Sequence, residues 1–327
     1  MRVPMMFPMR SLLGAAVAAG LLVPVAGGPA FADGGDGGFT IKDPRITESS
    51  GLAASRAHPG VYWTHNDSGD GPYVYAVDSK TGETVATITM TGVGHPRDVE
   101  AISVGTDGNI YVGDIGDNLG GKWDHVWIYE FPEPAALGDA TVRAAQYVVT
   151  YADGPRDAES LMVHPKTGRI YIASKKEGGG GLYEGPERLS ASGTNVFRRT
   201  DEVPWVTDGA FSPDGTKLAL RGYYWAAEYD WVNGRLGTRH AVEAPLMRQS
   251  ESVTYTLDGT ALLFGSEGES SPVARVPVVT GAGAKPPSGK GSSAAGGSGS
   301  TNLVYGALVF AGATALWLGG RRLLRRK

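Results

Sequence analysis

Acidic residues recur along the chain in a fixed local context, just ahead of short apolar segments. The clearest copies are residues 96–102 and 155–161, which read PRDVEAI and PRDAESL. Looser copies surround Glu48, Asp208 and Glu251. Carboxylates accept hydrogen bonds, transfer protons and are hard oxygen ligands for Ca²⁺. If the fold brings the copies together, these candidate ligand-binding residues are Glu48, Asp98, Glu100, Asp157, Glu159, Asp208 and Glu251.

Two interpretations of these acids stay open at this point. Carboxylates within a few ångströms repel one another by several kcal/mol at an effective dielectric of about 20. They persist only when protonated, hydrogen-bonded or gathered around a cation, and an all-oxygen ligand set favours Ca²⁺. In the other interpretation, each acid accepts hydrogen bonds from backbone amides of a neighbouring repeat. Arg97 and Arg156 would then neutralise the acids beside them.

Two loops rich in Asp, Asn and Gly offer a second set of metal ligands. They read NDSGD at 66–70 and DIGDN at 114–118. Acidic and amide side chains spaced by small residues can wrap Ca²⁺, yet neither loop has the twelve-residue spacing and terminal Glu of an EF-hand. Asx turns that close the loops explain them equally well. The candidate metal ligands in these loops are Asp67, Asp70, Asp114, Asp117 and Asn118.

Signatures of common catalytic sites are absent from the sequence. There is no Gly-x-Ser-x-Gly elbow, no His-Glu-x-x-His motif and no phosphate-cradling loop. His65 is expected to be a structural histidine bonded to a main-chain carbonyl. Aromatic residues at 223–225 and 231 suit either a carbohydrate platform or packing between sheets. The chain has no cysteine, which excludes disulfides and a thiol nucleophile.

The elements that position these residues follow a longer period. Each acid precedes an apolar segment, a turn with glycine and a second apolar segment. Asp-Gly between apolar runs, as at 107–108, 214–215 and 258–259, is a strong hairpin signal. Antiparallel units of about 40–50 residues are typical of propeller blades. The sequence therefore predicts an all-β fold, a single β-propeller of five to six blades over residues 39–280. A sixth blade would be closed by 39–46 with 273–279.

Four segments carry a more specific resemblance: residues 48–55, 63–70, 98–102 and 113–118. They resemble an uncharacterised family of secreted bacterial β-propellers, distantly similar to regucalcin/gluconolactonase-like and phytase-like propellers. The family commonly reads Asp-Trp-Glu-Asp where this chain reads DVEA. It also tends to have an Arg after the Gly-Asp-Asn element, where this chain reads GGKW at 120–123. The resemblance implies the fold, and fold alone does not imply an activity.

Both ends of the chain carry targeting signals. Residues 1–32 are predicted to be a signal peptide, with a basic start, an apolar stretch and Ala-Phe-Ala before Asp33. Residues 281–302 are predicted to be a flexible Gly/Ser/Pro-rich linker. The uncharged apolar residues 303–320, at about 1.5 Å per residue, suffice to cross a bilayer. The basic tail at 321–327 predicts a cytoplasmic end.

This topology is that of a single-pass protein of the plasma membrane with its N-terminal domain outside the cytoplasm. Without the signal peptide and the tail, 23 basic residues face 34 acidic ones, a net charge of −11. Such a surface excludes nucleic acid as an expected partner and suits cations or a neutral, sugar-like ligand. The leading hypothesis is a tethered extracellular propeller that binds a ligand or protein at an acid-lined channel mouth with the help of Ca²⁺. The alternatives are a metal-dependent hydrolase of lactonase, esterase or phosphatase type and a structural cell-surface protein.

Overall fold

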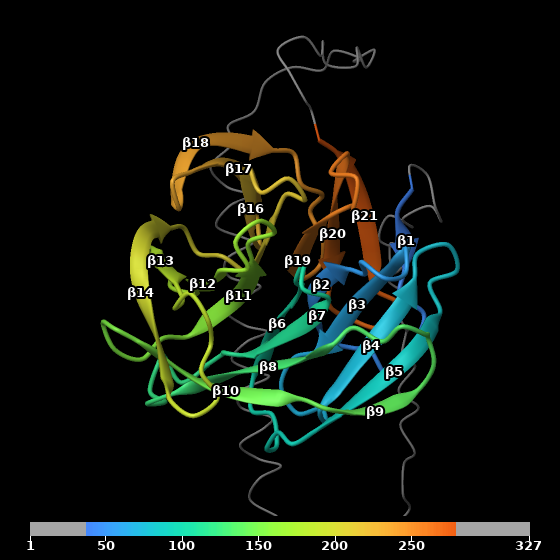
Figure 1. Ribbon diagram of the computed structural model, residues 1–327. Helices are drawn as coiled ribbons and strands as arrows, with labels where there is room; N and C mark the ends of the chain where they lie inside the picture. Colours follow the sequence, from blue (N-terminus) through green and yellow to red (C-terminus); the bar gives the residue numbers. More distant parts are fainter. Residues whose placement is uncertain (1–36, 279–327) are drawn as a thin grey trace, which may run out of the picture. The chain divides into compact units, whose positions relative to one another are not determined.

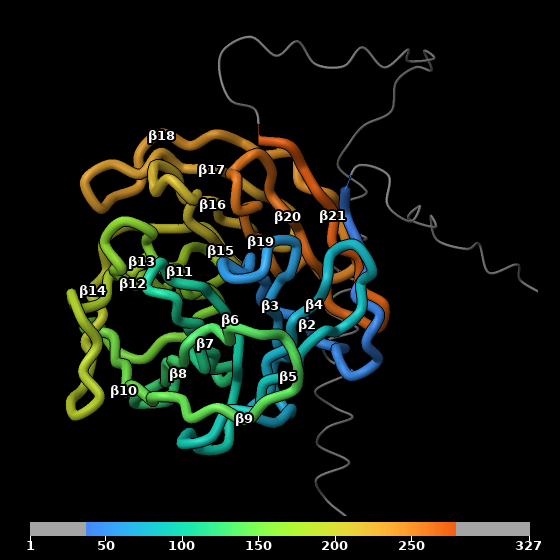
Figure 2. The backbone as a smooth tube through the Cα atoms, turned by 45° about the vertical axis from the view of Figure 1, so that its right-hand side comes forward, coloured from blue at the N-terminus to red at the C-terminus, as the bar shows by residue number. Residues whose placement is uncertain are grey.

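Short strands joined by tight turns make up the part of the chain that the structure describes. In this computed structural model the described residues are 37–278, and twenty-one strands lie within them. Their hydrogen bonds define four sheets, and the eight-stranded one divides at the parallel pair of β10 (Ala145–Tyr151) and β14 (Thr194–Val203) into two units. The resulting five units, called sheets below, surround a central axis (Figures 1 and 2). The prediction of an all-β fold built from repeated small sheets is confirmed.

Each sheet is described from the axis outward. The first contains β2 (Ser49–Ala54), β3 (Val61–Asn66), β4 (Tyr73–Asp78), β5 (Thr84–Thr91) and β9 (Ala140–Arg143). The second contains β6 (Val99–Val104), β7 (Asn109–Asp114), β8 (Val126–Pro132) and β10 (Ala145–Tyr151). The third contains β11 (Ala158–Val163), β12 (Ile170–Ser174), β13 (Gly180–Glu184) and β14 (Thr194–Val203).

The last two sheets follow the same plan. The fourth contains β15 (Asp208–Phe211), β16 (Lys217–Gly222), β17 (Trp225–Val232) and β18 (Arg235–Val242). The fifth contains β19 (Ser250–Tyr255), β20 (Ala261–Ser266), β21 (Pro272–Pro277) and β1 (Phe39–Thr40). The innermost strands lie side by side in the order β2, β6, β11, β15 and β19, and β19 adjoins β2 again. A closed ring of small radial sheets is the architecture of a β-propeller.

The fifth sheet joins the two ends of the described chain. Phe39 pairs with Val273, so β1 supplies the outer strand beside β21. The expectation that residues 39–46 and 273–279 close a sixth blade is therefore wrong for the residues that the structure describes. These segments complete the fifth sheet, and the ring is already closed by β19 against β2.

The Asp-Gly turns form the hairpins that the sequence predicts. Asp107, Asp214 and Asp258 each accept a hydrogen bond from the backbone amide two residues later, at 3.0–3.1 Å. The glycine after each aspartate has a positive φ, which glycine adopts without steric cost. These turns join the first two strands of the second, fourth and fifth sheets.

The hydrophobic core lies between adjacent sheets. Five clusters of buried apolar side chains fill the five spaces around the ring. Between the third and fourth sheets, Trp231 packs against Tyr171 and Phe211 with ring centroids 4.9 Å apart in both pairs. Trp231 therefore fits the packing interpretation of the aromatic residues, whereas Tyr224 is 70% exposed.

Two connections tie neighbouring sheets together. β9 lies in the connection between β8 and β10 and pairs in parallel with β5 of the first sheet (Figure 1). β14 pairs in parallel with β10 and so joins the third sheet to the second. The first sheet thus receives a fifth strand from a segment that belongs to its neighbour.

The predicted signal peptide (1–32), linker (281–302), membrane helix (303–320) and tail (321–327) lie outside the described residues. Between residues 37 and 278, no helix is long and apolar enough to cross a membrane.

Candidate functional site

The innermost strands begin at the same end of the ring, and several of the predicted acids lie there. Glu100, Glu159 and Glu251 are the second residues of β6, β11 and β19. All three are almost fully buried. The charge on Glu159 raises the pKa of both Glu100 and Glu251, after the larger effect of burial. The structure thus places acids from three sheets at one end of the axis, which we call the acid mouth.

A β-bulge explains why these side chains face the axis. Four of the five innermost strands have an irregular register in their first residues. The irregular segments include Ser50, Glu100, Glu159 and Glu251. A bulge inserts one extra residue and changes the direction of its side chain. The glutamates therefore leave the regular alternation of the strand and enter the mouth.

In the first, third and fifth sheets, the residue that follows the second strand also faces this mouth. The backbone amides of Asp67, Lys175 and Glu267 donate to the carbonyls before β2, β11 and β19, at 2.9, 2.8 and 3.1 Å. The same backbone bond therefore positions three different side chains beside the bulged strands. Sequence reasoning missed Lys175 and Glu267 because it followed the repeat only on the first strand of each sheet.

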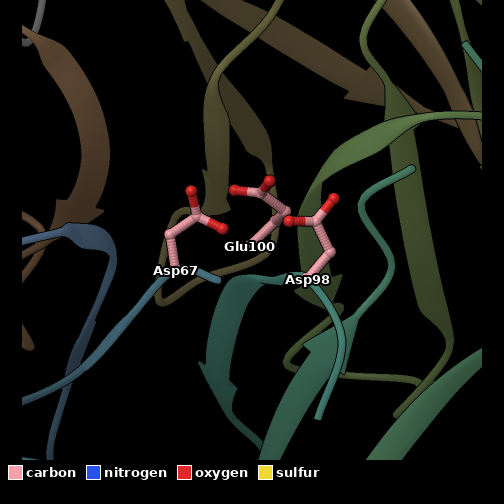
Figure 3. Close-up of side chains that lie close together, drawn as sticks. All are labelled: Asp67, Asp98 and Glu100. Carbon is pink, nitrogen blue, oxygen red and sulfur yellow. The ribbon is translucent and has the colours of Figure 1, made fainter. Parts of the chain in front are cut away.

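One side of the mouth holds three carboxyl groups close together. Asp67, Asp98 and Glu100 each offer an oxygen, and these oxygens lie within 4.8 Å of one another (Figure 3). Burial, and then the charges of Asp98 and nearby glutamates, raise the pKa of Asp67 to about 9. Burial also raises the pKa of Glu100 well above its ordinary range. Atom Oδ1 of Asp67 is buried and has no hydrogen-bond partner within residues 37–278.

The loop after β7 holds two of these acids in place. Asn118 donates to Asp98 Oδ2 from its side-chain amide at 2.9 Å and from its backbone at 3.3 Å. A Cβ at Gly116 would lie 2.7 Å from Asp98 Oδ2 and 2.8 Å from Glu100 Cγ. Glycine is required at this position because the loop passes so close to the acids. The two hydrogen bonds from Asn118 therefore hold the carboxylate of Asp98 in its orientation within the cluster.

The opposite side of the mouth contains a cation of its own. Lys175 Nζ lies 2.6 Å from Glu159 Oε1 and 5.8 Å from the ring of Tyr223. Burial lowers the pKa of Lys175, but the negative charge of Glu159 and of the other acids raises it well above its ordinary range. Burial raises the pKa of Glu159 to about 7 even though Lys175 lowers it. This half of the mouth is an internal ion pair.

Glu267 completes the mouth next to the first sheet. Ser50 Oγ donates to Glu267 Oε1 at 3.1 Å, and the side-chain amide of Gln249 donates to the other carboxylate oxygen. Burial, and then the charge of Glu48, raise the pKa of Glu267 to about 7, although the hydrogen bonds from Ser50 and Gln249 lower it. Glu48 is therefore near enough to Glu267 for its charge to raise the pKa of that carboxyl.

Two of the predicted acids accept hydrogen bonds from backbone amides. Asp208 accepts the amide of Gly209 at 2.7 Å and that of Val253, in the next sheet, at 2.8 Å. Asp157 accepts the amide of Asp117 at 2.9 Å. These bonds fit the interpretation in which acids join neighbouring repeats. Burial still raises the pKa of Asp208 well above its usual range.

The remaining loop acids close turns. Asp70 accepts Asn66 Nδ2 at 2.7 Å and the amide of Gly71 at 2.7 Å. Asp114 accepts the Tyr129 hydroxyl at 2.6 Å. Asp117 accepts the backbone amides of residues 122 and 123. Of the five loop residues predicted to bind metal, Asp67 alone belongs to the group of three carboxyls in the described part of the chain.

The arginines next to the acids have other partners. The guanidinium of Arg97 lies between the rings of Trp123 and Trp127, 4.0 and 3.8 Å from their centroids. Arg156 pairs with Asp153 at 2.7 Å. The expectation that these arginines neutralise the adjacent acids is therefore wrong, because stacking and a turn acid hold them elsewhere.

His65 is a structural residue. Its Nδ1 lies 3.0 Å from the carbonyl oxygen of Asn66, and its side chain is buried. Burial lowers the pKa of His65 to about 4, so the imidazole is neutral at physiological pH. The prediction that His65 bonds a main-chain carbonyl is confirmed.

Searches against known protein families and against curated proteins find no match. Solved structures share a weak similarity. A protein from Bacteroides uniformis proposed to be a 6-phosphogluconolactonase has a TM-score of 0.40 and 14% identity, over 72% of this chain and 69% of that one. U3-55K has a TM-score of 0.41 and 11% identity, over 77% and 100% of the two chains. The RRP9 WD40 repeats have a TM-score of 0.40 and 10% identity, over 73% and 96%.

Proposed function

We propose that this chain is a membrane-tethered extracytoplasmic propeller that binds a divalent cation, Ca²⁺, in the acid mouth and through it an oxygen-bearing ligand. The observation that carries the proposal is the group formed by Asp67, Asp98 and Glu100, whose oxygens lie within 4.8 Å of one another. Ca²⁺ binds oxygens at about 2.3–2.6 Å, so ligand atoms on opposite sides of the ion are up to ~5 Å apart. The spacing suits one shared ion.

The charge balance around this group supports a cation. Lys175 neutralises Glu159 on the other side of the mouth at 2.6 Å. The charge of Lys175 also lowers the pKa of Glu100, but among the described residues Asp67, Asp98 and Glu100 form no ion pair of their own. Asp67 Oδ1 also lacks a hydrogen-bond donor there. Buried carboxyls in this situation keep a proton or bind a metal ion. A calcium ion would displace the proton that Asp67 holds at neutral pH.

The tether is the second part of the proposal. The apolar residues 303–320 and the basic tail would anchor the chain, and the linker would hold the propeller outside the membrane. Membrane fractionation of the full chain and of a chain that stops at residue 302 tests this part. The full chain should pellet with membranes, and the shortened chain should be released after export.

Ion content tests the cation site directly. The purified full chain, treated with chelator and titrated with CaCl₂ by calorimetry, should bind one ion per chain. Glu100→Gln should weaken binding at least about tenfold, because it removes one carboxylate from the ligand set. Asp258→Asn, which alters a turn acid in the fifth sheet, is the matched control and should bind as the wild type does. Absence of calcium binding at millimolar concentration would contradict the proposal.

A metal-dependent hydrolase of lactonase, esterase or phosphatase type is the second candidate, and the pKa of Glu159 near 7 favours it. A carboxyl with that pKa can take or give a proton at neutral pH, while a bound cation polarises a carbonyl or phosphoryl oxygen. Turnover of a lactone, an aryl ester or an aryl phosphate that requires Ca²⁺ and is lost in Glu159→Gln would support it. Cation binding without turnover would support a binding protein. If the chain shows neither cation binding nor turnover, the structural surface protein is favoured.

A further inference from the structure

A groove of about 580 Å³ lies on the outer part of the first sheet, and none of Asp67, Asp98 and Glu100 lines it. Its lining includes Arg45, Tyr73, Tyr75, Thr89, Asp139 and Thr141. The wall formed by β9 comes from the neighbouring sheet, and a propeller does not need this fifth strand to close its ring. We propose that the groove is a second binding site and that it takes a neutral oligosaccharide.

The side chains of the groove form rows across the strands. Tyr73 of β4 pairs with Thr89 of β5, which in turn pairs with Thr141 of β9. Directly paired residues point to the same face of a sheet, and neighbouring strands are about 4.8 Å apart. An aromatic ring is therefore followed by two hydroxyl groups at regular spacing. Tyr75 and Thr87 form the next row.

The exposed ring suits a sugar face. Tyr73 is 38% exposed, and its ring lies 6.5 Å from that of Tyr75. Tyr75 is buried beneath it and its hydroxyl donates to Asp70 at 3.1 Å. One tyrosine is thus fixed as a support and the other is open to a ligand. A tyrosine with an open face and a polar edge contacts the C–H face of a sugar ring and the hydroxyls around it.

The charged groups around the groove already have partners. Arg45 Nη2 lies 2.6 Å from Asp43, and this hydrogen bond lowers the pKa of Asp43 to about 2. Asp139 Oδ1 accepts the backbone amide of Thr87 at 2.8 Å. An anionic ligand would meet the carboxylates of Asp70 and Asp139. Arg45, the one cation that lines the groove among the described residues, is already paired with Asp43. The groove therefore favours a neutral ligand that is rich in hydroxyl groups.

Unused hydrogen-bonding capacity completes the argument. The hydroxyl of Thr87 is buried and has no hydrogen-bond partner within the described range. Asp139, Thr89 and Thr141 line the same groove, and one carboxylate oxygen of Asp139 already accepts the amide of Thr87. Acceptors and hydroxyls along an open groove are the groups that hydrogen-bond successive sugar hydroxyls.

The segment that carries β9 is firmly held, so the groove is preformed. Glu133, at the start of this segment, accepts the Trp63 indole N–H at 2.8 Å and the Ser55 hydroxyl at 2.6 Å. Its other oxygen accepts the backbone amides of Arg56 and Ala57. One acid thus fixes the connection from the second sheet onto the first. A preformed site loses less conformational entropy when a ligand binds.

Calorimetry of the full chain with cellotetraose, maltotetraose and chitotetraose tests the proposal, with tetragalacturonate as the anionic comparison. At least one neutral tetrasaccharide should bind at millimolar concentration or below, and tetragalacturonate should bind more weakly. Tyr73→Ala should weaken that binding at least about tenfold, because it removes the aromatic face. The nearly isosteric double variant Thr89→Val/Thr141→Val should also weaken it while the melting temperature stays close to that of the wild type.

Two control variants separate this site from the mouth. Tyr224→Ala removes another exposed tyrosine and should leave saccharide binding unchanged. Glu100→Gln should also leave it unchanged, so this site and the cation site can fail independently. The proposal is overturned if no neutral tetrasaccharide binds, if tetragalacturonate binds more tightly, or if Tyr224→Ala abolishes binding while Tyr73→Ala does not.

Discussion

The two halves of the acid mouth are built alike but differ in how their charge is balanced. In the third sheet a bulged strand directs Glu159 to the axis, and Lys175 pairs with it at 2.6 Å. In the second sheet a bulged strand directs Glu100 to the axis, where Asp67 and Asp98 meet it. The half with Glu159 contains the ammonium group of Lys175, whereas the half with Glu100 consists of the carboxyl groups of Asp67, Asp98 and Glu100. The chain therefore balances its own charge on one side of the mouth and leaves it open on the other.

A single equivalent position creates this difference. Asp67 and Lys175 each follow the second strand of their sheet, and each donates its backbone amide to the residue that precedes the bulged strand by one position. The backbone bond is the same in both places, so the side chain at this position decides whether a cation or an acid enters the mouth. Lys175 pairs with Glu159 of its own sheet, whereas Asp67 meets Asp98 and Glu100 of the next sheet. The strands supply the scaffold, and this one position determines its chemistry.

Among the substitutions that test this difference, Lys175→Met is expected to change the free energy of unfolding most. It leaves Glu159 buried without its partner, and loss of one member of a buried pair typically costs about 3–5 kcal/mol. The free energy of unfolding should fall by that order at pH 8, as measured by chemical denaturation. It should fall less at pH 5, where Glu159 is protonated. A variant that is as stable as the wild type at pH 8 would show that this half needs no fixed cation.

Local rules of sequence predicted most of the architecture. Asp107, Asp214 and Asp258 are followed by glycine between apolar runs, and each forms the expected turn. The repeat around Glu100 and Glu159 predicted that acids begin equivalent strands. Such features depend on a few neighbouring residues, which the sequence displays directly.

The members of the mouth that follow second strands could not be found in this way. Asp67, Lys175 and Glu267 are equivalent in the structure, but two are acids and one is a lysine, so the sequence shows no clear repeat at this position. The bulges were hidden for a related reason. Asp208 is the acid of the repeated frame in the fourth sheet, yet β15 has a regular register. The Asp208 carboxylate accepts a hydrogen bond from the backbone of β19. Whether a strand bulges depends on its pairing, which the sequence alone does not show.

The dependence of stability on pH separates the two halves. The pKa values of Glu159 and Glu267 near 7, and of Asp67 near 9, are above those of carboxyls in an unfolded chain. The folded chain then holds protons that the unfolded chain has released, so stability falls as pH rises. The fall extends from about pH 4.5 to 7 for the glutamates and on to about pH 9 for Asp67, by at most ~1.4 kcal/mol per pH unit for each group.

Thermal denaturation from pH 4 to 9, with and without CaCl₂, measures this dependence. Calcium in excess should remove the loss of stability between about pH 7 and 9, because it replaces the proton on Asp67. Calcium should not change the dependence of stability on pH below pH 7, because that dependence comes from the titration of Glu159. Identical profiles with and without calcium would mean that both halves are balanced by protons alone.

Asp67→Lys gives the second half of the mouth a fixed cation, with a smaller effect on stability. An ammonium group after β3 would lie beside Asp98 and Glu100 of the next sheet, so stability at pH 8 should rise by about 1 kcal/mol. Calcium binding should be lost, because the lysine takes the place of the ion. Asp67→Asn is the control: it also removes the carboxyl ligand but supplies no cation, so it should weaken calcium binding without matching the gain at pH 8. Calcium affinity equal to that of the wild type in Asp67→Lys would mean that the ion does not bind at this half, and the contrast between the halves would then concern stability alone.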